Sequence, residues 1–149
     1  MKHFKKTTPK QLGELLIERG IINRDQLGIA IEHQKKKGGL LGEILVELKF
    51  ATEQDITQAL TCQYGFPYLP LSNYEIDPEV IKSIPEDVCR RFCLVPIDKI
   101  GKSITLAMAN PLNFQAAEDV EILTGCTVQA FVSTSTDIKQ TIDKYYKSS

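Results

Sequence analysis

The stretch that decides the fold runs from Gln11 to Gln63, because it contains one 24-residue pattern twice. The first copy, residues 11–34, reads QLGELLIERGIINRDQLGIAIEHQ, and the second, residues 40–63, reads LLGEILVELKFATEQDITQALTCQ. When the copies are shifted by 29 positions, seven residues are identical and six further positions pair apolar with apolar side chains. A spacer of five residues, 35–39, separates them. This agreement indicates an internal duplication.

Each copy has the pattern of two short helices joined by a turn. In the first copy, leucines at helical spacing predict a helix with one apolar face: Leu12, Leu15 and Leu16. Thr8, followed by Pro9, is the expected N-cap. Gly20 is expected to end the helix, because glycine readily takes the left-handed conformation found there.

The second helix of each copy has its own start and stop signals. Asn23 is the expected cap of the first one, and Gly38 follows three lysines at its end. In the second copy Thr52 is the expected cap, and Lys49 stands where the first copy has Gly20, so that this turn lacks its preferred residue. Two such units in tandem predict a small helical bundle.

Two features of the repeat are unusual for a helical core. Gly13 and Gly42 lie early in their helices, where glycine costs about 1 kcal/mol relative to alanine, so either tight helix packing or the approach of a ligand is expected there. Gln34 and Gln63 place amides on otherwise apolar faces, where each needs a hydrogen-bond partner. A single glutamine of this kind would favour a structural role. Because both glutamines and both glycines occupy equivalent places in the two copies, they favour a shared recognition surface with two similar halves.

These motifs resemble the MshEN domain, the N-terminal domain of the assembly ATPases of type II secretion and type IV pili. The resemblance rests on Leu-Gly-x-x-Leu followed by Leu-x-x-Ala-Leu-x-x-Gln in two copies, and it extends over nearly the whole chain, including residues 63–67 and 107–111. It implies a non-catalytic regulatory or docking domain that binds cyclic di-GMP. This ligand has two guanines and two phosphates, so two copies of one motif can each meet one half of it.

The resemblance also implies a set of site residues. Glycine backbone would approach the ligand, leucines would supply apolar contact, and the glutamines and an asparagine from the second half would hydrogen-bond: Gln11, Leu12, Gly13, Leu16, Gln34, Leu41, Gly42, Leu45, Gln63 and Asn110. Three positions depart from the family pattern. Gln11 stands where binding members carry arginine, Asn110 stands where aspartate is frequent, and Leu40 opens the second motif without a polar group.

A second interpretation belongs to another class of function. The family's N-terminal domain also docks its ATPase onto the cytoplasmic part of an inner-membrane partner, so the chain is alternatively a protein-interaction module that has lost nucleotide binding. Both interpretations place it in the cytoplasm, recruited to the inner membrane through secretion or pilus proteins.

The second half of the chain changes period and predicts an α+β fold. We place the domain boundary in the glycine- and proline-containing segment 64–70, which gives a helical repeat subdomain over residues 1–66 and an α+β subdomain over residues 67–149. Helices are expected at 79–84, 85–92, 112–124 and 137–146, the last capped by Ser135 or Thr136. Apolar runs 94–100 and 103–109 around Gly101-Lys102 predict a β-hairpin, and 127–133 a third strand, with helices on one side of the sheet.

Composition argues against several other classes. The 18 basic and 19 acidic residues are well mixed, so that no nucleic-acid track and no general attraction to acidic membranes is expected. No segment approaches the roughly 18 apolar residues of a spanning helix, so no direct membrane insertion is expected. Gly101-Lys102-Ser103 is not expected to be a P-loop, because Pro96 occupies the position of that motif's first glycine. The four cysteines and two histidines do not have zinc spacing, and the cysteines are expected to be reduced and mostly buried. No nucleophile and base pair is apparent, so neither an active site nor a cofactor is expected.

Overall fold

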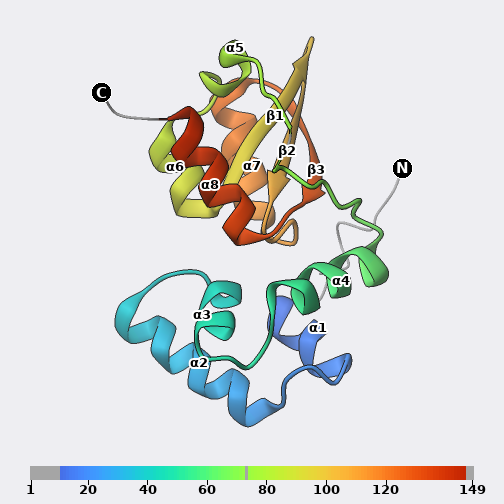
Figure 1. Ribbon diagram of the computed structural model, residues 1–149, viewed down its shortest axis with the longest axis vertical. Coiled ribbons are helices and arrows are strands. Elements are labelled where there is room, and N and C mark those ends of the chain that lie inside the picture. The colour runs from blue at the N-terminus through green and yellow to red at the C-terminus, as the bar shows by residue number, and fades with distance from the viewer. Residues whose placement is uncertain (1–10, 73, 147–149) are drawn as a thin grey trace. The chain divides into compact units, whose positions relative to one another are not determined.

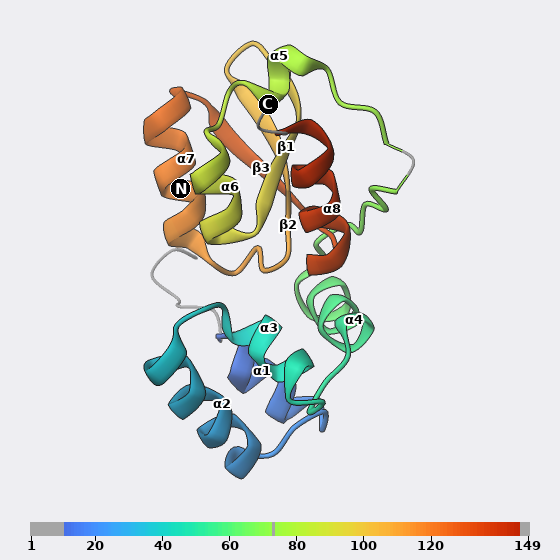
Figure 2. The same cartoon turned by 60° about the vertical axis from the view of Figure 1, so that its left-hand side comes forward.

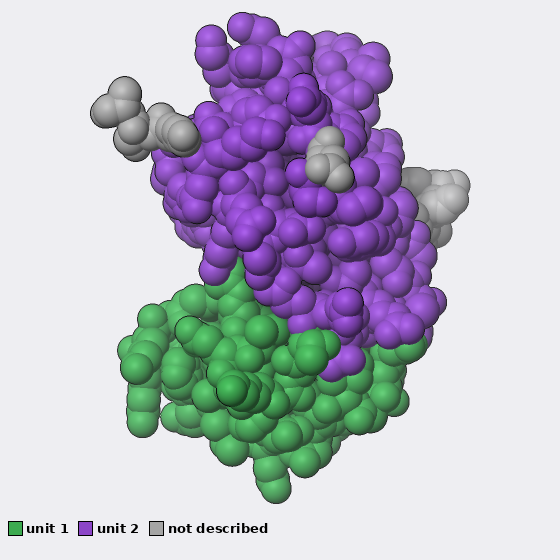
Figure 3. Space-filling view, viewed as in Figure 1, with its two compact units in different colours: residues 1–52 green, residues 53–149 purple. Residues whose placement is uncertain are grey.

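The computed structural model describes residues 11–72 and 74–146, so the expected cap at Thr8 lies outside the described residues. Contacts divide the chain into two compact units, residues 1–52 and residues 53–149 (Figure 3). The described elements are α1 (Leu12–Glu18), α2 (Arg24–Lys37), α3 (Leu41–Glu47), α4 (Glu53–Tyr64), α5 (Pro78–Ile81), α6 (Glu86–Phe92), β1 (Leu94–Ile100), β2 (Ser103–Met108), α7 (Phe114–Thr124), β3 (Thr127–Val132) and α8 (Ser135–Tyr145) (Figure 1). The predicted α+β class is confirmed.

The first unit contains α1, α2 and α3, with the helix signals largely where the sequence predicted them. The Asn23 side chain accepts a hydrogen bond from the Gln26 backbone, whose own side chain accepts one from the Asn23 N–H, which completes a capping box at the start of α2. The helix ends at Gly38, after its three lysines. Helix α1 begins at Leu12, and Gln11 is its N-cap with extended backbone.

The two copies of the motif fold alike through α1, α3 and the turns that follow them. In the first copy, the N–H groups of Gly20 and Ile21 donate to the carbonyls of Ile17 and Leu16, both at 2.9 Å. In the second copy, 29 positions later, those of Lys49 and Phe50 donate to Val46 and Leu45 at 3.0 and 2.9 Å. The duplication is therefore structural as well as sequential across this part of the repeat.

The core of the first unit is formed by the apolar faces of its three helices. Both α1 and α2 contact α3. Side chains from all three helices are buried, namely Leu15 and Leu16 from α1, Ala30 from α2, and Ile44 and Leu45 from α3. Burying a leucine or isoleucine side chain contributes about 1.5–3 kcal/mol each, so these residues contribute substantially to the stability of this small unit.

The second unit is built on a three-stranded sheet of order β1-β2-β3. Strands β1 and β2 form the predicted antiparallel hairpin around Gly101, with an irregularity between Pro96 and Asp98. Strand β3 runs parallel to β2, from the pair Ser103 and Thr127 to the pair Met108 and Val132. A parallel pair needs a crossover connection, and α7 supplies it.

One face of this sheet packs against helices and is most buried along β2. Along β2 the alternate residues Ile104, Leu106 and Met108 are buried, and their partners on β3 are Val128, Ala130 and Val132. Helices α6, α7 and α8 lie on the same side of the sheet in both views, as predicted (Figures 1 and 2). Successive side chains of a strand point to opposite faces of the sheet. The other face, which includes Gln129, is therefore more exposed.

Some predicted helix boundaries were wrong. Helix α8 begins at Ser135 rather than Asp137, because Thr134 is the cap and its hydroxyl accepts from the Asp137 N–H. Helix α7 begins at Phe114 rather than at residue 112, because the Asn113 side chain accepts from the Ala116 N–H and fixes the first turn there. Helix α5 ends at Ile81, earlier than the predicted residue 84.

Helix α4 belongs by its contacts to the second unit. It contacts β3, and its Glu53 carboxylate accepts a hydrogen bond of 2.6 Å from the Thr136 hydroxyl at the start of α8. The boundary between the two units therefore lies before α4, whereas we place the domain boundary after α4, at residue 66. That domain boundary stays a prediction.

Candidate functional site

Most of the predicted leucine contacts are core residues. Leu12, Leu16 and Leu45 are at most 5% exposed, and the Leu16 and Leu45 carbonyls also hold the turns after α1 and α3. Leu41 is half-buried at the first position of α3. Apart from Leu41, the predicted leucine contacts are therefore buried and do not form an open surface.

Gly13 has a packing reason for being glycine. A Cβ at this position would lie 2.7 Å from Cδ1 of Leu27, so the Leu27 side chain of α2 would have to move to admit a larger residue. Gly42 is the second residue of α3, as Gly13 is of α1, and it is half-buried. Of the two explanations for these glycines, the contact of Gly13 favours tight helix packing in the first copy.

Gln34 has a structural partner. Its side-chain Nε2 donates to the Gly39 carbonyl at 3.0 Å, which ties the end of α2 to the spacer between the copies. Gln11 is exposed, and its carbonyl accepts from Leu15 at 3.0 Å as the first hydrogen bond of α1. The donating amide of Gln34 satisfies the requirement for a partner that the sequence indicated.

The last two predicted residues belong to the second unit. Gln63 is exposed near the end of α4. Asn110 is half-buried, and its Oδ1 accepts from the Leu112 N–H at 3.1 Å, which shapes the loop that leads into α7. The first unit thus brings together the leucine and glycine positions of α1 and α3, and a site that also includes Gln63 and Asn110 stays a prediction.

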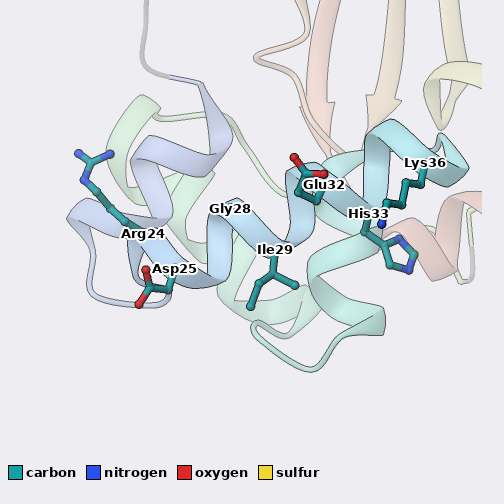
Figure 4. Close-up of a pocket in the computed structure, with 7 residues that line it drawn as sticks. All are labelled: Arg24, Asp25, Gly28, Ile29, Glu32, His33 and Lys36. Carbon is teal, nitrogen blue, oxygen red and sulfur yellow. The ribbon is translucent and has the colours of Figure 1, made fainter.

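The sequence did not reveal two surface depressions, which lie on corresponding faces of α2 and α4. The first is lined entirely by α2, from Arg24 to Lys36, and Figure 4 shows its seven residues along the helix. The second is lined by α4 together with Tyr68 and Thr134. Shifting Asp25, Gly28, Ile29 and Glu32 by 29 positions gives Gln54, Thr57, Gln58 and Thr61, so the repeat itself could have indicated the correspondence.

The groups with the largest pKa shifts, Cys89 and Tyr146, are not among the predicted site residues or those that line the two depressions. Burial raises the pKa of the Cys89 thiol from 9.0 to about 11, although its hydrogen bond to Tyr146 opposes the shift. Burial also raises the pKa of Tyr146, whose hydroxyl lies 2.7 Å from the carbonyl oxygens of Ile81 and Ile84. Both groups are therefore protonated at neutral pH, and they link α6 to the end of α8 structurally.

The other motifs considered in the sequence do not form a phosphate-binding or metal-binding site in the described residues. Gly101-Lys102 is the turn of the β1-β2 hairpin, so the rejection of a P-loop is confirmed. Among residues 11–72 and 74–146, no three acidic, histidine or cysteine side chains are grouped to hold a metal ion. Within the same residues, no helix has both the length and the apolar character needed to span a bilayer.

Comparisons with known proteins agree with this architecture. The chain is 35% identical over 136 residues to the type IV pilus assembly ATPase PilB of Myxococcus xanthus; the alignment covers 91% of the chain and 24% of that protein. The chain thus spans about a quarter of the length of this relative.

Two solved structures share the fold. One is a structure of MshE with cdg, at 29% identity and a TM-score of 0.68, covering 93% of this chain and 100% of that one. The other is the N-terminal domain of XpsE, at 19% identity and a TM-score of 0.71, covering 97% and 98%. The profile of the MshEN domain matches residues 64–149, so the chain belongs to the MshEN domain family.

Proposed function

We propose that this chain is a regulatory domain that binds cyclic di-GMP through its tandem motifs. The observation that carries the proposal is the structure of MshE with cdg, cyclic di-GMP, which aligns with 93% of the chain at 29% identity. This alignment includes the duplicated motifs, whose α1 and α3 segments form the same hydrogen bonds 29 residues apart.

The ligand's symmetry suits such a duplication. Cyclic di-GMP presents two equivalent halves, and Leu41 and Gly42 repeat the places of Leu12 and Gly13 at the starts of their helices. N–H groups in the first turn of a helix have no partner inside the helix and can donate to a phosphate or guanine oxygen. The exposed amides of Gln11 and Gln63 would add donors and acceptors for a guanine edge.

Calorimetry with the full chain tests the proposal. Cyclic di-GMP is expected to release or absorb heat on binding and to raise the thermal midpoint of unfolding at saturation. Cyclic di-AMP is expected to bind less well, because adenine presents a donor where guanine has its O6 acceptor. An absence of both heat and thermal protection with the wild-type chain and with Gln11→Arg would refute nucleotide binding.

A second candidate function is docking onto a protein partner of the secretion or pilus machinery. It is favoured by α7, which exposes three large apolar side chains: Phe114 at 53%, Ile122 at 82% and Leu123 at 50%. Contiguous exposed apolar surface, rather than a single exposed side chain, marks a protein-binding site, and Ile122 and Leu123 are neighbours in the chain. The two candidates are separable, because Ile122→Glu would weaken docking and leave nucleotide binding unchanged.

A further inference from the structure

The outer face of α2 contains a glycine that no contact among the described residues explains. Gly28 is the fifth of the 14 residues of α2, where glycine is disfavoured by about 1 kcal/mol relative to alanine. Unlike Gly13, it would place an added Cβ in open space, with nothing within 4 Å. A helix-interior glycine on an exposed face permits close approach by a second backbone from outside.

The residues one turn to either side of Gly28 carry opposite charges. Arg24, Gly28 and Glu32 are spaced by four residues, so they form one row along the helix, and all three are exposed. Arg24 lies 3.5 Å from Glu14 in a solvent-exposed ion pair, which contributes little and leaves its guanidinium accessible. Figure 4 shows Arg24 and Glu32 on the two sides of Gly28, within the depression on α2.

The second copy of the repeat uses the equivalent row for packing. The residues 29 positions later are Glu53, Thr57 and Thr61 of α4, and all three are half-buried. Glu53 accepts the hydrogen bond of Thr136, while Thr57 and Thr61 line a hollow with Tyr68 and Thr134. The row that is covered on α4 is thus exposed on α2.

We propose that this row, Arg24, Gly28 and Glu32, is a self-association surface on which α2 packs antiparallel against α2 of a second copy. A two-fold axis through Gly28 brings the two glycines together at the crossing and places Arg24 of each copy opposite Glu32 of the other. The row is therefore complementary to itself, as a two-fold interface requires. The neighbouring side chain of Ile29, 53% exposed, would bury apolar surface at the edge of the contact.

Charge reversal on the full chain tests the pairing. The wild-type protein is expected to show a concentration-dependent monomer–dimer equilibrium in sedimentation velocity, weakened by salt because the flanking pairs are ionic. Arg24→Glu places two carboxylates opposite each other, and Glu32→Arg two guanidinium groups, so each variant is expected to dimerise at least tenfold more weakly. The double variant, and an equimolar mixture of the two single variants, restore opposite charges and are expected to recover the dimer.

Two further variants separate this surface from others. Gly28→Leu is expected to abolish the dimer without lowering the thermal midpoint of the monomer, because the added side chain meets open space. Lys37→Glu reverses an exposed charge away from the row and is expected to leave the dimer unchanged. A chain that stays monomeric up to about 1 mM, or a dimer that is insensitive to both Gly28→Leu and the charge reversals, would overturn the proposal.

Discussion

Lys49 has the same left-handed backbone conformation as Gly20, with a φ of 64° against 76°. The two residues are 29 positions apart and end the corresponding turns of the repeat, so the duplicated fold imposes one conformation on two different residues. Glycine adopts this conformation freely, whereas a residue with a Cβ is strained by about 1–2 kcal/mol.

We therefore expect Lys49→Gly to stabilise the chain by about 1 kcal/mol in denaturant titrations. Lys49→Ala is the control, because it removes the charge and keeps the Cβ, and it is expected to change stability little. Gly20→Ala is expected to destabilise by a similar 1 kcal/mol, since the added Cβ meets no neighbour within 4 Å and only the backbone conformation opposes it. A destabilised Lys49→Gly variant would mean that its side chain contributes more than the strain costs.

Gly13→Ala is expected to destabilise the chain by about 1–3 kcal/mol, because its Cβ would overlap Cδ1 of Leu27. In a Leu27→Ala background the same substitution is expected to cost little, which a double-mutant cycle in urea would measure. Gly28→Ala, measured at a protein concentration low enough to keep the chain monomeric, is the matched helix-interior control. That variant is expected to be stabilised by up to about 1 kcal/mol, because its Cβ is unopposed.

Gln11→Arg is expected to tighten cyclic di-GMP binding roughly tenfold or more, the equivalent of about 1–3 kcal/mol for a good bidentate base contact. The substitution is not expected to alter the fold, because Gln11 is exposed and its side chain makes no capping bond. Gln140→Arg adds the same charge at an exposed position of α8 and serves as the control in calorimetry. Equal tightening by both variants would point to net charge rather than to a specific contact.

The Cys89 thiol is expected to make stability fall at alkaline pH. Its pKa is raised by burial from 9.0 to about 11, so the unfolded chain releases this proton at lower pH than the folded chain. The corresponding stability is fully present below pH 9 and is lost as the pH rises through 11; it amounts to about 2–3 kcal/mol. Urea titrations between these values would show a shallower loss in Cys89→Ala, and identical slopes for the two proteins would contradict the assignment.

The local signals in the sequence were sufficient for most of the elements. The cap at Asn23 and the two apolar runs around Gly101 each act over a few residues, so their chemistry can be read without knowing what packs against them. The duplication likewise follows from residue identity alone. The misplaced start of α8 falls in a run of four hydroxyl residues, 133–136, any of which could serve as the cap. Before α7 both Asn110 and Asn113 could serve, and only the structure selects Asn113.

What remained undetermined depends on contacts between residues distant in the sequence. Gly13 and Gly28 are both glycines inside helices, yet only Gly13 is pressed against a neighbouring side chain, and nothing in the local sequence distinguishes them. The parallel pairing of β3 with β2 and the place of α4 in the second unit likewise depend on tertiary packing. The sequence by itself thus determined the repeat, the cap at Asn23 and the family resemblance, because these rest on local chemistry. The tertiary structure alone decided which of those residues are core, which are paired and which remain exposed, because burial is a property of the surroundings and not of the residue.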